Sequence, residues 1–129
     1  MFVGINHVTI IVNDKKRASD FYFNILGFEK VDIGKSLWAK VGKQYIHINE
    51  NSKHVVQKSF QHFSVEVDNL LPFLEQLINN DVDVFDLDDN NNKKDININL
   101  NKQMRNYFVN DPFGNLIEFI DSTNKFFNP

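Results

Sequence analysis

Cysteine is absent from this chain of 129 residues, and that absence narrows the chemistry that the protein can perform. Without a thiol there are no disulfides, no thiolate nucleophiles and no zinc sites built on cysteine. Any metal ion must therefore be held by histidine, aspartate or glutamate side chains. The chain has four histidines, so the positions of those few residues become informative.

Basic patches, long apolar runs and a leader-like start are missing as well. The formal net charge is −3, with acidic and basic residues interspersed, so nucleic acid is not an expected partner. No apolar run approaches the roughly 20 residues that span a bilayer, so a membrane is not expected either. The start, Met1-Phe2-Val3-Gly4, lacks the basic region of a signal peptide. Together these features favour a cytoplasmic protein.

Phenylalanine, by contrast, is abundant, with 13 copies. Hydrophobic residues make up 42% of the chain and charged residues 24%, which is ordinary for a globular protein. The length allows one compact domain or two very small modules packed together. We therefore expect a core or a ligand pocket rich in aromatic side chains.

The first half of the chain predicts a strand, a helix and three further strands. Asp14 can cap the helix, and Gly27 supplies the left-handed residue at which helices end. Two Gly-Lys pairs give hairpin spacing between the later strands. The strand-like runs cover residues 3–12, 28–33, 36–41 and 44–49. The helix carries an amphipathic stripe made of Ala18, Phe21, Tyr22, Ile25 and Leu26.

The second half repeats that order with one polar insertion. An alternating strand at 61–67 precedes a helix that Asn69 can cap, with Pro72 in the first turn. A strand at 82–87 and a mobile polar loop at 88–94 follow, and Ile96, Ile98 and Leu100 hint at an extra short strand. The last hairpin pairs 104–110 with 115–121 around a type I turn at Asp111-Pro112-Phe113-Gly114. The apolar stripe of the helix consists of Leu70, Leu74, Leu77 and Ile78.

The two halves are an internal duplication. His7 and His62 occupy the same place in the first strand of each half, and His47 and Glu118 occupy the same place in the fourth strand. The second offset is larger because of the polar insertion. The fold class predicted is α+β, one domain over residues 1–129 made of two βαβββ modules, 1–56 and 57–129.

These four equivalent positions predict a metal site. Two modules related by a pseudo-two-fold axis would bring three imidazoles and one carboxylate to a common point, a donor set that suits Mn, Fe, Co, Ni or Zn. Each of the four lies in mid-strand among apolar neighbours, where an unpaired polar group is costly to bury. The predicted metal ligands are His7, His47, His62 and Glu118.

Each residue also has a plainer interpretation. A single strand histidine is more often a hydrogen-bonded core or rim residue, and Glu118 alone would more often face outward. It is the joint occurrence on equivalent positions that favours the site. Thr9 and Ser64, on the same strand faces, either reflect β-propensity or bind substrate. The fourth histidine, His54, lies in a polar stretch and is expected to be exposed.

Three segments of the chain resemble the glyoxalase/bleomycin-resistance/dioxygenase superfamily, also called the vicinal-oxygen-chelate superfamily. They are residues 4–9, residues 21–28 and residues 107–118, the last containing the Asp-Pro-x-Gly-Asn-x-x-Glu ending. The resemblance implies modules whose mixed sheets curl into half-barrels, commonly paired in a homodimer. It also implies metal ligands at His7, His62 and Glu118, often with a fourth at His47.

The chain departs from particular members of that superfamily. Glutathione-dependent lyases carry an arginine where this chain has Ile11, and the only arginines here are Arg17 and Arg105, so glutathione is not an expected substrate. Fosfomycin enzymes carry a tyrosine at the position of Phe108 and an arginine near Phe127, which argues against fosfomycin chemistry. Extradiol dioxygenases have longer chains and additional acid–base histidines.

The leading functional hypothesis is a metal-dependent lyase or isomerase acting on a small substrate with vicinal oxygens. The metal would chelate those oxygens and stabilise an enediolate or alkoxide, and Glu118 would act as the base. The main alternative is a non-catalytic drug-binding protein of the bleomycin-resistance type, with a cleft lined by phenylalanine. A dioxygenase, a thiol transferase of the same superfamily, or a structural or regulatory module stays open.

Overall fold

The computed structural model describes residues 1–94 and 106–127 of the chain. The fold consists of mixed sheets with few helices, as the α+β prediction required. The chain forms two compact units: an N-terminal unit of Met1–Lys58 with Asp111–Asn115, and a C-terminal unit of Ser59–Asn110 with Leu116–Pro129. Their boundary lies close to the module boundary expected at 56/57, while the single-domain assignment stays a prediction.

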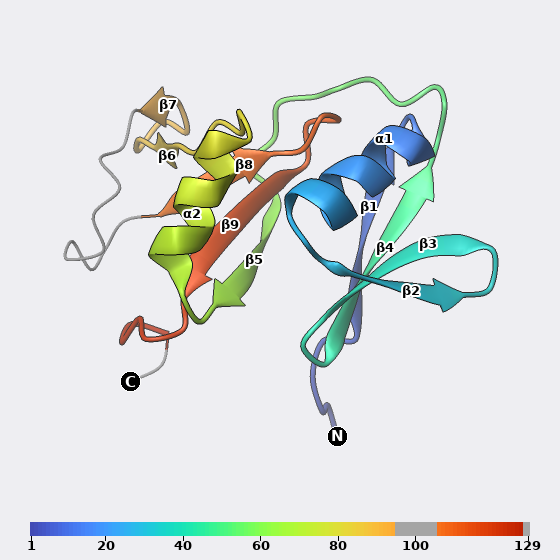
Figure 1. Cartoon of the computed structure of the whole chain (residues 1–129), viewed down its shortest axis with the longest axis horizontal. Helices are drawn as coiled ribbons and strands as arrows, with labels where there is room; N and C mark the ends of the chain where they lie inside the picture. The colour runs from blue at the N-terminus through green and yellow to red at the C-terminus, as the bar shows by residue number, and fades with distance from the viewer. Residues whose placement is uncertain (95–105, 128–129) are drawn as a thin grey trace. The chain divides into compact units, whose positions relative to one another are not determined.

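The N-terminal unit is built on a four-stranded mixed sheet (Figure 1). Its strands are β1 (His7–Val12), β2 (Glu29–Ile33), β3 (Ser36–Val41) and β4 (Gln44–Glu50), in the order β1-β4-β3-β2. Strand β1 runs parallel to β4, and the other neighbours are antiparallel. The first strand is shorter than the predicted 3–12, because its ladder begins where His7 meets Tyr45, at the start of β4.

One helical segment covers a face of this sheet. It starts as α1 (Lys15–Ser19), where Asp14 accepts a hydrogen bond from the backbone N–H of Arg17, and continues as a wider π-helical turn, η1 (Asp20–Ile25). The sequence pattern did not reveal the π turn, because its apolar stripe reads the same in either geometry. Gly27 ends the segment at φ +78°, as predicted. The stripe of Ala18, Phe21, Tyr22 and Leu26 is buried, and Ile25 is half-buried.

The C-terminal unit repeats this plan with a three-stranded sheet. Strands β5 (His62–Val67), β8 (Tyr107–Asn110) and β9 (Leu116–Asp121) lie in the order β5-β9-β8, with β5 and β9 parallel. Helix α2 (Leu70–Asn79) lies against the sheet (Figure 1), and its Phe73 ring contacts Phe119 edge-on at 4.9 Å. No helix in the described part of the chain has the length and apolarity needed to cross a bilayer.

Two predictions for α2 were wrong. Asn69 stands at the N-cap position, but its side chain makes no capping hydrogen bond, because a ψ of 71° takes the backbone away from the extended geometry of a capping residue. Ile78 is 45% exposed, whereas Leu70, Leu74 and Leu77 are buried. Those three leucines complete the stripe that the sheet covers, and Ile78 lies one position beyond it.

The segment 82–94 also differs from its prediction. The expected strand 82–87 is reduced to β6 (Asp86–Leu87) and an isolated bridge between Phe85 and Phe108. The polar loop is closed by the Asp88 carboxylate, which accepts hydrogen bonds from two backbone N–H groups, and it ends in β7 (Lys93–Lys94), paired with β6. The extra strand expected at 96–100 lies outside the described residues.

A buried carboxyl group organises the turn between β8 and β9. Asp111 is 4% exposed and accepts hydrogen bonds from Tyr22 Oη (2.6 Å), from the backbone N–H of Phe113 and from Asn115. Burial, reinforced by the charge of Asp111 and this hydrogen bond, raises the pKa of Tyr22 well above its ordinary value.

Gly114 closes the turn at φ +87°, where an added Cβ would lie 2.8 Å from Val56 Cγ1. The predicted turn is confirmed by the Gly114 N–H, which donates to the Asp111 carbonyl.

Candidate metal and substrate site

The predicted ligands occupy matching positions in the strand ladders of the two units. Thr9 of β1 pairs with His47 of β4, and Ser64 of β5 pairs with Glu118 of β9, both in parallel register. The duplication read from the sequence therefore holds at the level of individual strand pairs.

The matching extends to a third strand. Trp38 of β3 lies opposite His47, and Phe108 of β8 lies opposite Glu118, both in antiparallel register. Each unit thus holds a half-site of four equivalent positions. The N-terminal half-site is His7, Thr9, Trp38 and His47, and the C-terminal half-site is His62, Ser64, Phe108 and Glu118.

The half-sites lie on the sheet faces that the helices leave uncovered. Side chains alternate between the two faces of a strand. In β4 the buried side chains of Ile46 and Ile48 flank His47, and in β1 the exposed His7 and Thr9 alternate with buried Ile10. In the N-terminal unit the polar ligand candidates therefore stay exposed or half-buried while the alternate positions form the core, whereas in the C-terminal unit Glu118 is itself buried.

Aromatic contacts define the N-terminal half-site. The imidazole of His47 is stacked on Trp38, with ring centroids 4.3 Å apart and planes 14° apart. The ring of His7 meets Trp38 edge-on at 5.1 Å and lies 6.5 Å from that of His47. His7 Nδ1 lies 2.7 Å from the Asn6 side-chain oxygen, which can only accept a hydrogen bond. The Nδ1 proton is thereby used, and Nε2 keeps a free lone pair.

The C-terminal half-site shows the same tautomer. His62 Nδ1 donates to the Phe60 carbonyl at 2.8 Å, which leaves Nε2 unprotonated in the neutral ring. That Nε2 lies 3.8 Å from Glu118 Oε1. Ser64 Oγ donates to the same carboxylate oxygen at 2.5 Å, and Phe108 contacts His62 edge-on at 5.2 Å. Glu118 is only 8% exposed.

These donors fit a divalent ion. Histidines that bind metals usually donate the other ring N–H to a carbonyl or carboxylate, as His7 and His62 do here with Asn6 and Phe60. A buried carboxylate with a single short hydrogen bond is a suitable anionic ligand. Each unit contributes two of the four predicted ligands, and among all the described residues no group of three or more His, Asp or Glu side chains that could hold a metal ion is found.

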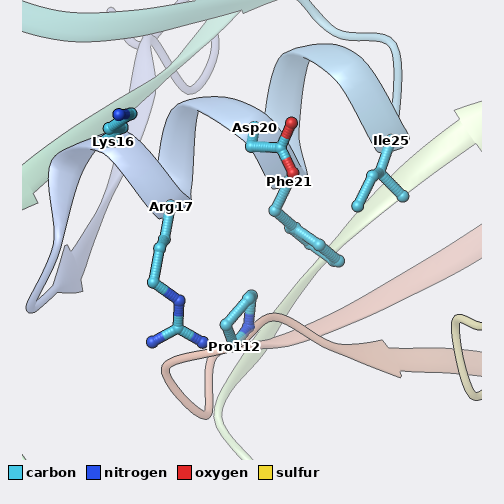
Figure 2. Close-up of a pocket in the computed structure, with 6 residues that line it drawn as sticks. All are labelled: Lys16, Arg17, Asp20, Phe21, Ile25 and Pro112. Carbon is cyan, nitrogen blue, oxygen red and sulfur yellow. The ribbon is translucent and has the colours of Figure 1, made fainter.

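A cavity in the N-terminal unit is separate from this chemistry. It has a volume of about 430 Å³ and lies beside the helical segment (Figure 2). The Arg17 guanidinium at its rim lies 5.5 Å from the centre of the Phe113 ring. None of the predicted site residues lines it; the lining residues are Lys16, Arg17, Asp20, Phe21, Ile25 and Pro112.

A model of the Glyoxalase/Bleomycin resistance protein/Dioxygenase superfamily matches residues 4–119. The chain belongs to this superfamily. The match includes both half-sites and confirms the resemblance seen in residues 4–9, 21–28 and 107–118.

Solved structures of glyoxalase-superfamily and related proteins share the fold. A glyoxalase family protein from Bacillus anthracis is 26% identical, with a TM-score of 0.74 over 94% of this chain and 96% of that one. The fosfomycin resistance protein FosX from Listeria monocytogenes is 19% identical, with a TM-score of 0.71 over 97% and 98% of the two chains. FosX from Mesorhizobium loti is 15% identical, with a TM-score of 0.72 over the full length of both. A comparison with curated proteins found no match.

Some sequence interpretations need correction. His54 is half-buried rather than exposed, with Nε2 3.4 Å from the Phe113 carbonyl, because the polar stretch around it folds against the 111–115 turn of its own unit. Glu118, whose plainer interpretation was an outward-facing residue, is buried.

Nothing in the sequence indicated that four further residues support the ligands. Asn6 and Phe60 each precede a strand-one histidine and hold its Nδ1 proton, while Trp38 and Phe108 contact the imidazoles. The equivalence of Trp38 and Phe108 could not be read from the repeat, because their offset is 70 whereas that of His47 and Glu118 is 71, so a constant offset pairs Trp38 with Val109.

Proposed function

We propose that the protein is a metal-dependent lyase or isomerase of the glyoxalase superfamily that acts on a small substrate with vicinal oxygens. His7, His47, His62 and Glu118 are the ligands of one divalent ion. The observation that carries the proposal is the shared tautomer of His7 and His62: each Nδ1 proton is held by an acceptor, so each Nε2 is available to a metal.

The proposal requires the two half-sites to share one ion, either within one chain or between two chains of a homodimer. Mn, Fe, Co, Ni and Zn all suit three imidazoles and a carboxylate. The homodimer expected from the superfamily is tested by sedimentation equilibrium with and without added metal. The cytoplasmic location expected from the sequence also stays a prediction.

A bound divalent ion would supply Lewis-acid polarisation of the substrate oxygens. The side chains of the chain do the rest. The Glu118 carboxylate is buried and, once released from the ion, would accept a proton from a substrate carbon, with Ser64 holding one of its oxygens. Since the Ser64 proton is used by Glu118, Ser64 can contact a substrate only as an acceptor. The Thr9 hydroxyl is the equivalent group of the other half-site.

Metal analysis of protein purified without chelator or affinity tag tests the proposal. We expect close to one equivalent of a divalent ion per chain, following from one shared donor set. A His7→Ala/His62→Ala protein should lose the ion and keep its circular dichroism spectrum. His54→Ala is the matched control and should keep the ion, because His54 already contacts a backbone carbonyl away from the half-sites.

Two results would overturn the proposal. One is wild-type protein that takes up none of the five ions at micromolar concentration, and the other is a double variant that keeps a full equivalent. Tight binding of a planar cationic drug in excess chelator would instead support the alternative of a non-catalytic binding protein.

A further inference from the structure

We propose that Trp38 and Phe108 are equivalent positioning residues, which set the ring planes of the strand-one histidines so that each Nε2 is presented for metal binding. This inference rests on the proposed metal site and adds the residues that shape it. Neither aromatic residue is itself a ligand or a catalytic residue.

The first observation is that the same contact occurs twice. His7 meets Trp38 edge-on with centroids 5.1 Å apart and planes 71° apart, and His62 meets Phe108 at 5.2 Å and 87°. The two aromatic residues occupy the same register position, opposite the fourth-strand ligand. The sheets of the two units thus hold equivalent imidazoles in nearly the same way.

Ring orientation matters because the lone pair of an imidazole nitrogen lies in the plane of the ring. The Nδ1 hydrogen bond fixes the tautomer but still allows the ring to tilt about it. An edge-on aromatic contact prefers one angle between the planes, so it removes that tilt. The hydrogen bond that Nδ1 donates to Asn6 or Phe60 and the aromatic contact together define the direction of Nε2.

Trp38 has an additional role that Phe108 lacks. Its ring is stacked nearly parallel to His47 at 4.3 Å. Such a stack covers one face of the imidazole and leaves the ring edge, where both nitrogens lie, free to bind a metal. In the other half-site the corresponding ligand is Glu118, which Ser64 orients by a hydrogen bond instead.

Core packing alone does not explain a tryptophan at this position. Leu37 and Ala39, its neighbours in β3, are buried on the helix side, whereas Trp38 is half-buried on the open face. Its ring contacts are with His7, His47 and Tyr45. The two predicted ligands of the unit are therefore its main aromatic partners.

Three variants of the full chain test the proposal. Trp38→Val keeps strand propensity but removes the ring, and Trp38→Phe restores the residue type found at position 108. Lys40→Leu is the control, because it changes the next residue on the same strand face, which pairs with Tyr45 rather than with a predicted ligand. The readouts are the ring ¹H–¹⁵N spectra of His7 and His47 in metal-free protein and the affinity for Zn²⁺.

We expect Trp38→Val to shift both histidine ring spectra and to weaken Zn²⁺ binding by about 10-fold, the loss typical of residues that orient metal ligands. Trp38→Phe should restore the His7 spectrum and bring the affinity to within about three-fold of wild type. Lys40→Leu should change neither. Unchanged spectra and unchanged affinity in a folded Trp38→Val protein would overturn the proposal.

Two cases need a readout that does not depend on metal affinity: wild-type protein that binds no ion, and a Trp38→Val protein that does not fold. If wild-type protein binds no divalent ion, the proposed function fails, but the metal-free histidine spectra still decide whether Trp38 orients the rings. If Trp38→Val does not fold, nuclear Overhauser contacts from the Trp38 indole to the rings of His7 and His47 in the unmodified protein support the proposal, and their absence overturns it.

Discussion

The two half-sites share a register and differ in how the second ligand is held. In the N-terminal unit that ligand is His47, half-buried and stacked on Trp38. In the C-terminal unit it is Glu118, buried and hydrogen-bonded by Ser64. The comparison teaches that strand pairing determines where a ligand stands, while the neighbouring side chain determines how it is oriented.

The difference also predicts unequal contributions to metal binding. The C-terminal half-site supplies the only predicted anionic ligand, and that ligand is already buried and oriented. The N-terminal half-site supplies neutral imidazoles on a more open face. We therefore expect substitutions to weaken binding most at Glu118 and least at the residues that only support a ligand.

The largest effect is expected for Glu118→Gln. The amide keeps the size of the side chain but removes the charge, and we expect Zn²⁺ affinity to fall by about 100-fold or more. Isothermal titration with chelator competition measures it. Glu118→Asp, which keeps the charge on a shorter side chain, is the control and should lose less. Equal affinity of Glu118→Gln and wild type would show that the carboxylate is not a ligand.

Removal of His47 should have the next largest effect. We expect His47→Ala to weaken Zn²⁺ binding by about 30-fold, more than the loss of a supporting residue, because a ligand is lost although three remain. His47→Glu makes the N-terminal half-site resemble the C-terminal one and should recover most of the loss in the same titration. A His47→Ala protein that binds Zn²⁺ as well as wild type would limit the site to His7, His62 and Glu118.

The buried Tyr22–Asp111 pair, which belongs to the N-terminal unit, gives a prediction for stability. Tyr22→Phe should lower the free energy of unfolding by about 1 kcal/mol at pH 7, because one buried hydrogen bond is lost. The folded-state pKa of Tyr22 is raised, so its contribution is fully present below the ordinary pKa near 10 and is lost as pH rises above it.

Urea unfolding between pH 7 and pH 11 measures this effect. Wild-type stability should fall above pH 10, and the fall should be smaller in Tyr22→Phe. Tyr45→Phe is the matched control, since that half-buried tyrosine contacts the Trp38 ring, and its alkaline fall should equal that of wild type. Identical pH profiles for Tyr22→Phe and wild type would contradict the prediction.

The smallest effect is expected at Ser64. Ser64→Ala removes the hydrogen bond to Glu118 but no ligand, so Zn²⁺ affinity should fall by only about three-fold. Ser64→Thr introduces the residue found at the equivalent position 9 and should restore the affinity. A loss as large as that of Glu118→Gln would mean that Ser64 does more than orient the carboxylate.

Much of the fold could be predicted from local patterns. Gly27 and the two Gly-Lys turns set element ends that the structure reproduces within a residue or two. The match between His7 and His62 indicates the duplication without any knowledge of strand pairing. These signals are local, because they depend on periodicity and on backbone conformations that glycine adopts easily.

What the sequence did not reveal depends on contacts between distant residues. The burial of Glu118 follows from its position on β9 between two strands, and the partly buried state of His54 follows from the Phe113 carbonyl. The strand expected at 82–87 failed because only its last two residues find a partner in β7. Neither ring contacts nor tautomers could be read from spacing alone.

The Tyr22 hydroxyl and the Asp111 carboxyl group are 89 positions apart in the chain. During synthesis, the helix and four strands of the N-terminal unit leave the ribosome long before the turn that supplies the acceptor of Tyr22. Until then a buried phenol has no hydrogen-bond partner from Asp111, so the nascent N-terminal unit lacks part of its final stability. Its folding is therefore completed only when the last hairpin of the chain is made, and the order of synthesis delays maturation of the half-site that it carries.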